Sequence, residues 1–414
     1  MQTLNSSRRS FMKWVAAAPL LSQIAVSDLY AKAASAVGRD LRQNVYTRLG
    51  IKTVINCRGT WTYLSGSLEF PEVREAMIEA GQYFVNVLDL QHAIGRRLAE
   101  LTGAEFGMIT SGAAGAMAVA TAGSMAGTDD KLIWQLPDTT GLKNEVVMSG
   151  GRSAFDSAIR LTGAKLVLAY SPEELANAIN QNTTLIYTTH LGDELQKELA
   201  IAKDHKVPLL LDDAAGIPPA DNAKLYARMG IDLYTFSGGK GLRGPQCSGV
   251  LLGRKDLIDA ATHNNSPNSD TVGRGMKVSK EQIVGMVAAV DWFLSQTDAS
   301  LEAEFRRRAD KIAAQLKSIP TLESRVVIPN VAANAVPHLL LRYDTQRIKI
   351  RPVDVMAELR KGTPSIELNP QTGRKPGSGL PSDESTIVVG VWMLEPGEEV
   401  IVARRIKEIL EKAV

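Results

Sequence analysis

A lysine flanked by glycines and an aspartate that closes an apolar run are the residues best suited to chemistry. Lys240 has glycines at 238, 239 and 241, which are predicted to let the backbone approach a ligand closely, and Asp212 follows three leucines. An amine that forms a Schiff base with an aldehyde cofactor benefits from partial loss of water, because desolvation lowers its pKa. An aspartate facing a ring nitrogen keeps that nitrogen protonated, so the ring can withdraw electrons. Lys240 and Asp212 are therefore the predicted catalytic pair.

A third segment, 110–115, has the composition of a phosphate-binding loop. It reads Thr-Ser-Gly-Ala-Ala-Gly and leads into a helix of almost only small residues, 116–126. The free N–H groups of such a helix start, together with the Ser111 hydroxyl, can bind a phosphate. The three segments in this order predict pyridoxal 5'-phosphate as cofactor. The predicted cofactor-binding residues are Ser111, Gly112, Ala113, Asp212, Ser237 and Lys240.

Other interpretations of these residues remain open at this point. A nucleotide-binding loop of the G-x-x-x-x-G-K-S/T type needs a hydroxyl after its lysine, and Gly241 occupies that position. Lys240 is alternatively a lysine of an exposed turn. Asp212 is alternatively a helix cap, although Asp213 is better placed for capping.

The elements that position these residues follow the alternation of an α/β protein. Between about 105 and 252, short runs rich in β-formers alternate with helical stretches, as expected for β-α-β units in a mostly parallel sheet. Predicted helices include 154–161, 172–179 and 194–205. The predicted strands, which together make a seven-stranded sheet, are 107–110, 145–148, 165–169, 184–188, 208–212, 233–236 and 249–252.

The C-terminal part is predicted to be a smaller α+β domain. Long helical stretches at 281–295 and 301–319 precede it, and a helix at 397–413 ends it. Strands are expected at 336–342, 365–368 and 386–392, and a Gly/Pro/Ser-rich loop at 369–385. The predicted organisation is a signal peptide at 1–33, an N-terminal arm at 34–60, a large α/β domain at 61–284 and a small domain at 285–414.

The N-terminus has the features of a twin-arginine export signal. Arg8 and Arg9 precede an apolar run of about eleven residues, 14–24, which is shorter than the roughly 20 residues that a membrane helix needs. Small-residue cleavage motifs follow at 31–36. We therefore expect a periplasmic or exported protein, a contact with the twin-arginine machinery and no membrane span. The alternative is an amphipathic N-terminal helix.

Composition and charge exclude several classes of protein. The 414 residues are 44% hydrophobic and 22% charged, which is typical of a globular chain and not of a disordered one. The net charge is +2. Residues 1–33 hold four basic residues and one acidic residue, so the remaining chain carries −1. Without a basic field, nucleic-acid binding is not expected.

Cysteines and histidines give no sign of a metal site. Cys57 and Cys247 are 190 positions apart and are predicted to be buried thiols, with a disulfide between them as the alternative. The five histidines are too scattered for metal-ligand spacing, so no metal is predicted. His190 follows a predicted strand end, where it either lines the site or serves as an ordinary turn residue.

Around Ser111, Asp212 and Lys240 the sequence resembles the fold-type I pyridoxal-phosphate enzymes of the aminotransferase class V-like group. Within that group it resembles selenocysteine synthase and D-glucosaminate-6-phosphate ammonia-lyase. The resemblance covers nearly all of the chain after the signal, and its most specific part is Phe-Ser-Gly-Gly-Lys at 236–240 with Arg-Gly-Pro-Gln at 243–246. It implies Lys240 as the Schiff-base lysine, Asp212 as the partner of the ring nitrogen and 111–113 as the phosphate site. It also implies a homodimer or larger homo-oligomer.

The sequence departs from relatives where substrate would bind. Relatives tend to carry an arginine near 365–369 for a substrate carboxylate, whereas Glu367 and Asn369 stand here. Relatives commonly have a histidine or another polar residue after the strand at 145–148, whereas this chain has glycines at 150 and 151, with Arg152 or Phe155 as candidates for stacking on the ring. The candidate carboxylate partners, each alternatively an ion-paired surface residue, are Arg58, Arg274 and Arg351, and Arg152 is a further candidate substrate residue.

These observations predict an enzyme that acts on a small amino compound. The favoured reaction is α,β-elimination of the ammonia-lyase type on an amino acid or amino-sugar acid, with Lys240 removing the Cα proton. The alternatives are an aminotransferase and an exported protein that binds pyridoxal phosphate without turnover. Selenium transfer to a seryl-tRNA fits poorly with export and with a mature chain near −1.

Overall fold

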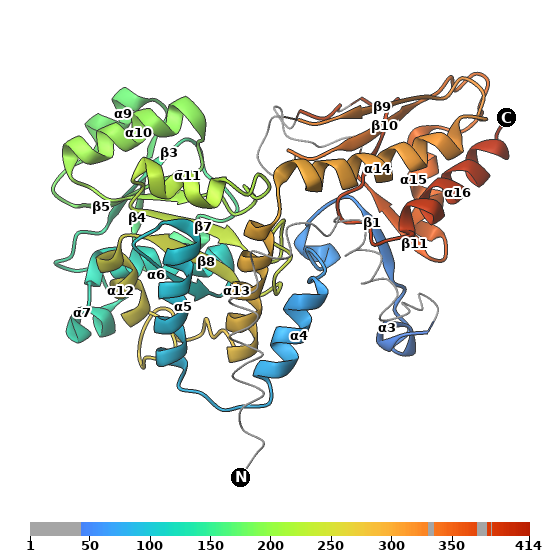
Figure 1. Ribbon diagram of the computed structural model, residues 1–414. Helices are drawn as coiled ribbons and strands as arrows, with labels where there is room; N and C mark the ends of the chain where they lie inside the picture. The colour runs from blue at the N-terminus through green and yellow to red at the C-terminus, as the bar shows by residue number, and fades with distance from the viewer. Residues whose placement is uncertain (1–42, 330–334, 371–378, 382) are drawn as a thin grey trace, which may run out of the picture. The chain divides into compact units, whose positions relative to one another are not determined.

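The computed structural model describes residues 43–329, 335–370, 379–381 and 383–414. The predicted signal at 1–33 lies outside these residues, as does much of the predicted loop at 369–385. The chain forms two compact units: Ser65–Trp292, and the part up to Leu64 together with Phe293–Val414 (Figure 1).

The unit Ser65–Trp292 is built on a seven-stranded sheet of order β2-β8-β7-β6-β5-β3-β4. All neighbouring strands run parallel except β8, which is antiparallel to both β2 and β7. The predicted seven-stranded, mostly parallel sheet is therefore confirmed. Its strands are β2 (Phe106–Thr110), β3 (Glu145–Ser149), β4 (Lys165–Ala169), β5 (Thr183–Thr188), β6 (Leu209–Asp212), β7 (Leu233–Ser237) and β8 (Gly249–Gly253).

Helices cover both faces of this sheet, which is why its central strands are apolar without alternation. Figure 1 shows α6 and α12 on one side of the sheet and α9 and α10 on the other. The small residues of α6 let this helix lie close to the strands and to α12. At Gly123 a Cβ atom would collide with the backbone of Ala260 and Ala261 on α12. The helices are α4 (Pro71–Ala80), α5 (Val87–Thr102), α6 (Gly112–Ala126), α7 (Asp130–Gln135), α8 (Ser157–Arg160), α9 (Pro172–Ala178), α10 (Gly192–His205), α11 (Asn222–Met229), α12 (Lys255–His263) and α13 (Lys280–Ser295).

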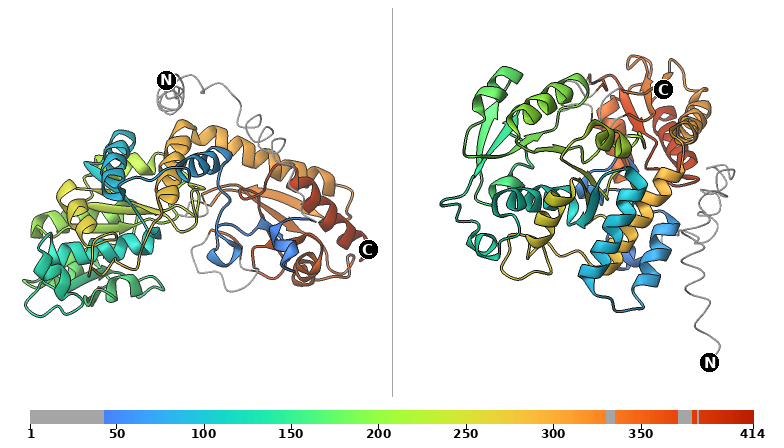
Figure 2. Two further views of the ribbon diagram at one scale, coloured as in Figure 1. Left: turned by 90° about the horizontal axis from the view of Figure 1, so that it is seen from below. Right: turned by 60° about the vertical axis from the view of Figure 1, so that its left-hand side comes forward.

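The other unit combines two small sheets with three longer helices. Strand β1, from the segment predicted as an N-terminal arm, pairs in parallel with β11. Strands β12, β10 and β9 form an antiparallel sheet, and α14 and α16 lie side by side (Figure 2). The elements are α3 (Val45–Arg48), β1 (Val54–Cys57), η2 (Thr62–Leu64), α14 (Asp298–Leu316), β9 (Glu323–Val327), β10 (His338–Arg342), α15 (Pro352–Lys361), β11 (Ser365–Leu368), β12 (Ile387–Gly390) and α16 (Glu398–Glu411).

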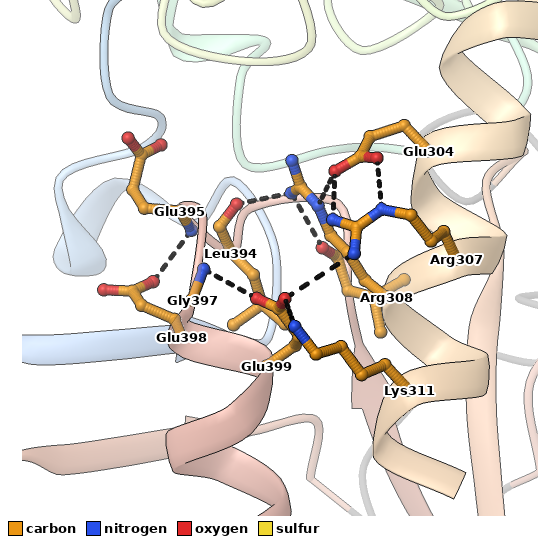
Figure 3. Close-up of polar contacts among 10 residues, drawn as sticks. Glu304, Arg307, Arg308, Lys311, Leu394, Glu395, Gly397, Glu398 and Glu399 are labelled. Atoms are coloured by element: carbon orange, nitrogen blue, oxygen red, sulfur yellow. Dashed lines mark hydrogen bonds and ion pairs between the residues drawn. The ribbon is translucent and has the colours of Figure 1, made fainter. Parts of the chain in front are cut away.

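A buried ionic network joins α14 to the turn before α16 (Figure 3). Arg308 is fully buried; its guanidinium donates to Glu304 over 2.9 Å and to the carbonyl of Leu394. Lys311 donates to the buried Glu399 over 2.9 Å. Because a buried charge is costly when it loses its partner, these contacts fix the turn against α14.

The structure also corrects local expectations. Helix α8 spans only Ser157–Arg160, because the preceding Ser153 N–H is bonded to the Asp156 carboxylate in a turn. Cys57 is buried as predicted, but Cys247 is exposed, and both are free thiols. Among the described residues, no helix is long and apolar enough to cross a membrane.

Candidate functional site

The predicted site residues of the larger unit gather at one edge of its sheet. Strands β2, β6 and β7 run in the same direction, since β8 is antiparallel to both β2 and β7. Ser111 follows β2, Asp212 ends β6, and Lys240 lies three residues beyond β7. The carboxyl ends of parallel strands are where α/β proteins bind ligands. The fold therefore brings together the three segments identified from the sequence.

Asp212 is held in a defined orientation by two donors. The hydroxyl of Tyr187, on the neighbouring strand β5, donates to Oδ2 over 3.1 Å, and the N–H of Ala214 donates to Oδ1 over 3.1 Å. Burial raises the pKa of Asp212, while Tyr187, Ala214 and the nearby charge of Lys240 act in the opposite direction. A carboxylate so fixed can pair with a protonated ring nitrogen.

Lys240 is partly buried beside two carboxyl groups. Desolvation lowers the pKa of its amine, and the charges of Asp212 and Asp213 oppose that shift. A lowered pKa increases the neutral fraction of the amine, which is the form that can attack a carbonyl or accept a proton.

The glycines around Lys240 serve a different purpose from the predicted close approach to a ligand. A Cβ on Gly241 would lie 1.7 Å from the carbonyl oxygen of Ile217, and one on Gly239 would lie 2.3 Å from Oε1 of Gln246. These glycines make room for protein atoms, so they pack the lysine loop against the rest of the unit. This packing fixes the backbone on both sides of Lys240.

The predicted phosphate loop is an open cradle at the start of α6. Ser111 is the N-cap residue, and its side chain makes no capping hydrogen bond. Gly112 has φ +73°, a conformation that favours glycine, and a Cβ there would meet nothing within 4 Å. The first N–H groups of a 15-residue helix lack intrahelical partners. Hydroxyl and N–H donors are therefore available for a phosphate group.

Strand β8 supports this cradle from behind and joins it to Ser237. Gly249 pairs with Ser237 at the end of β7 and also with Thr110. A Cβ on Gly249 would lie 2.5 Å from the carbonyl carbon of Gly112 and 2.7 Å from the nitrogen of Ala113. Only glycine fits at this position without moving the cradle.

Gly249→Ala is consequently expected to weaken cofactor binding by about tenfold or more, because about 1.4 kcal/mol of lost phosphate contact corresponds to that factor. Fluorescence or absorbance titration of the apoprotein with pyridoxal phosphate measures the dissociation constant. Gly275→Ala is the matched control, since a Cβ there meets nothing within 4 Å. Equal affinities of the two variants would contradict this role of Gly249.

Asp213 gives the unit a specific pH dependence. Burial raises its pKa to about 6, and the Tyr226 hydroxyl, 2.6 Å from Oδ2, opposes the shift. Because the folded-state pKa of Asp213 lies above its unfolded value, the protonated carboxyl contributes to the free energy of unfolding in full below about pH 4. This contribution is lost as the pH rises through about 6. The rise in the pKa of Asp213 from the ordinary value of 3.8 to about 6 corresponds to about 3 kcal/mol.

We therefore expect Asp213→Asn to gain stability over the wild type as the pH rises from about 4 to about 7, by up to about 3 kcal/mol. Urea unfolding of both proteins at the two pH values measures this difference. Asp221→Asn is a control, because that carboxylate is exposed and its pKa is lowered by Arg228. If the free energy of unfolding changed equally with pH in wild type and Asp213→Asn, burial would not raise the pKa of Asp213.

The four candidate arginines differ in their surroundings. Arg152 is exposed and pairs with Asp156, and Arg351 is exposed and pairs with Asp354 over 2.8 Å. Arg274 is exposed and donates to the Ser266 hydroxyl over 3.3 Å. Arg152 and Arg274 belong to the unit Ser65–Trp292, and Arg351 belongs to the other unit.

Arg58 belongs to the smaller unit and lies in an ionic cluster. Its Nη1 is 3.5 Å from Glu367, and its guanidinium carbon is 4.6 Å from the ring centroid of Trp61. Arg360 donates two hydrogen bonds to Glu367, over 2.7 and 2.8 Å. Glu367, which stands where relatives tend to carry an arginine, is thus neutralised by two arginines of its own unit.

Phe155, the other stacking candidate, is 58% exposed. His190 lies at the sheet edge, with Nδ1 2.7 Å from a carboxylate oxygen of Glu198. Tyr187 and Glu198 were not identified from the sequence. Tyr187 pairs in register with Leu210, two residues before Asp212, so the contact follows from the β5–β6 pairing that only the sheet order reveals.

Comparison with known proteins identifies related enzymes. The family model of aminotransferase class-V matches residues 159–339. A 5'-C-glycyluridine monooxygenase-decarboxylase of a Streptomyces species is 31% identical over 384 residues, covering 88% of this chain and 92% of that protein. An L-seryl-tRNA(Sec) selenium transferase of Desulfovibrio desulfuricans is 25% identical over 337 residues, covering 73% of this chain and 68% of that protein.

A third relative and a solved structure share one enzyme name. D-glucosaminate-6-phosphate ammonia lyase of Salmonella typhimurium is 28% identical over 392 residues, covering 89% of this chain and 99% of that protein. The structure of a D-glucosaminate-6-phosphate ammonia-lyase superposes with a TM-score of 0.76, covering 90% of this chain and 99% of that chain.

Fold, site and relatives together define a fold-type I enzyme that depends on pyridoxal phosphate. The chain belongs to the aminotransferase class-V family. The residues present fit the cofactor: the cradle at 111–113 suits a phosphate, Asp212 suits a ring N–H and Lys240 suits an aldehyde. When bound, pyridoxal phosphate supplies an electron-withdrawing ring that stabilises negative charge on the substrate carbon next to the amine.

Proposed function

We propose that this protein is a lyase that removes a β-substituent and then ammonia from a small amino acid or amino-sugar acid. The observation that carries the proposal is the full-length similarity to D-glucosaminate-6-phosphate ammonia lyase, in sequence and in fold. The paired arrangement of Lys240 and Asp212 at the sheet edge supports it.

The residues of this chain divide the work of such a reaction. Ser111 and the first N–H groups of α6 would hold the phosphate, and Asp212, fixed by Tyr187 and Ala214, would pair with the ring nitrogen and favour its protonated form. With the cofactor bound, the amine of Lys240 would be placed to take the Cα proton of the substrate. Its lowered pKa favours the neutral amine that this step requires.

A screen of amines with the purified holoenzyme tests the proposal. Ammonia and keto-acid release from β-hydroxy amino acids and amino-sugar acids, without any added acceptor, is the expected result. A requirement for a keto-acid acceptor would identify an aminotransferase instead. A protein that binds the cofactor and shows no spectral change with any amine would support the third alternative, an exported binding protein.

An oxygen-dependent decarboxylation is the second candidate function. The observation that favours it is the 31% identity to the monooxygenase-decarboxylase, which exceeds the identity to the lyase. An oxygen electrode in the same screen decides between them, because a lyase consumes no oxygen. Release of carbon dioxide coupled to uptake of oxygen would show that the protein is a decarboxylase of this kind and not a lyase.

Export and self-association complete the proposal. The arginine pair at positions 8 and 9 supports twin-arginine export to the periplasm. The loop between α4 and α5 presents exposed apolar side chains, with Tyr83 55%, Phe84 102% and Val85 49% exposed, which supports a homodimer or larger homo-oligomer. Cell fractionation tests the first part, and light scattering of wild type and Phe84→Ser tests the second.

A further inference from the structure

A buried carboxylate that the cofactor site does not use lies at the same edge of the sheet. Glu198, on α10, is 3% exposed. Its Oε1 accepts a hydrogen bond from the Ser149 hydroxyl and lies 2.7 Å from Nδ1 of His190. Its Oε2 is buried and has no hydrogen-bond partner among the residues described. Because burying such a group is costly, this network calls for a functional explanation.

The network fixes the hydrogen positions on the imidazole. An ionised carboxylate only accepts hydrogen bonds, so Ser149 and Nδ1 of His190 both donate to Glu198. The backbone N–H of His190 donates to Oγ1 of Thr188 over 2.9 Å, which anchors the residue behind β5. The second ring nitrogen, Nε2, is therefore the one that can exchange a proton.

The sheet order places His190 at the same edge of the sheet as the predicted catalytic pair. Strands β3, β5, β6 and β7 are consecutive neighbours, and at their carboxyl ends stand Ser149, His190, Asp212 and Lys240. A Cβ on Gly150 would lie 3.3 Å from Nε2 of His190. The glycine at this position thus leaves the nitrogen uncrowded, and the imidazole occupies the edge that follows β3.

We propose that His190, oriented by Glu198, is the general acid that protonates the leaving group. The inference rests on the proposed elimination. The amine of Lys240 takes the Cα proton, and the electron pair of that C–H bond forms the Cα–Cβ double bond. The Cβ–O bond breaks, and its oxygen takes the proton from Nε2 and departs as water. His190 is left neutral and regains a proton from solvent, and Lys240 releases the Cα proton to solvent, so both groups return to their starting state.

His190→Asn tests this role, because the amide keeps a donor near Glu198 and removes Nε2. The probes are DL-serine, whose hydroxyl must be protonated to leave, and β-chloro-DL-alanine, whose chloride leaves without a proton. We expect kcat for serine to fall by about 100-fold or more and kcat for chloroalanine by less than about tenfold. The matched control is His205→Asn, because His205 is exposed at the C-terminal end of α10. Equal losses on both probes would overturn the proposal.

A second measurement is independent of turnover. Nitrogen-15 spectra of the histidine-labelled holoenzyme, with His190 assigned by its loss in His190→Asn, are expected to show hydrogen on Nδ1 throughout the pH range in which the enzyme is active. Glu198→Gln should remove that preference and shift the pH profile of kcat; the charged groups facing the imidazole are Glu198 and Glu194, whose Oε2 is 3.7 Å away. Hydrogen on Nε2 alone would overturn the assignment.

The two measurements separate this inference from the function on which it rests. A wild type that binds the cofactor but eliminates neither probe and none of the amino-sugar acids of the screen overturns the proposed elimination and the general acid with it. A wild type that eliminates both probes, with a His190→Asn variant unchanged on serine, overturns the general acid alone.

Discussion

Lys240→Ala is expected to abolish turnover, with kcat reduced on the order of 10⁴-fold. The variant loses both the amine that bonds to the aldehyde and the base that takes the Cα proton. No other lysine is expected to replace it, because Lys240 is partly buried beside Asp212 and Asp213. The phosphate cradle is untouched, so the apoprotein should still bind the cofactor, although reversibly.

Borohydride treatment of the holoenzyme followed by peptide mass analysis provides the measurement. In the wild type the cofactor mass is expected on the peptide that contains Lys240, and in the variant it should be lost on gel filtration. Lys255→Ala is the control, because Lys255 is exposed and pairs with Asp259 on α12. Cofactor trapped on another lysine of the wild type would contradict the assignment.

Asp212→Asn is expected to lower kcat by about 100-fold or more, since the carboxylate that keeps the ring nitrogen protonated becomes a neutral amide. The amide is similar in shape, and its oxygen can still accept from Ala214 or Tyr187, so the fold should be retained. Cofactor affinity should fall by about tenfold, because a charge-assisted contact becomes a neutral one.

The neighbouring carboxylate is a matched control for this prediction. Asp213→Asn removes a buried charge one residue away that is bonded to Tyr226 instead of Tyr187. We expect its kcat to change by less than about tenfold, measured at the pH optimum of each variant. If the two variants lost activity equally, Asp212 would have no special relation to the cofactor.

Much of the large unit was predictable from local patterns. Buried parallel strands read as continuous apolar runs, so all seven were found at their observed positions within a residue or two. The segments around Ser111, Asp212 and Lys240 follow three of these strands, and strands of the same direction end at the same edge. For this reason the central part of the site followed from the sequence.

The remainder depends on strand order, which local patterns do not encode. The contact of Tyr187 with Asp212 requires β5 beside β6, and the contact of Ser149 with Glu198 joins β3 to a helix 49 residues later. The glycines at 239 and 241 were attributed to ligand approach, whereas their neighbours are Gln246 and Ile217. Spacing identified the residues but not the atoms that they touch.

The antiparallel strand β8 determines when the site can form during synthesis. It is the last strand of the sheet along the chain, yet it lies between β2 and β7, which carry the phosphate cradle and the lysine loop. A nascent chain that ends before Gly249 contains every predicted cofactor-binding residue but cannot join these two halves. We therefore expect the cofactor to bind only after β8 has joined β2 to β7.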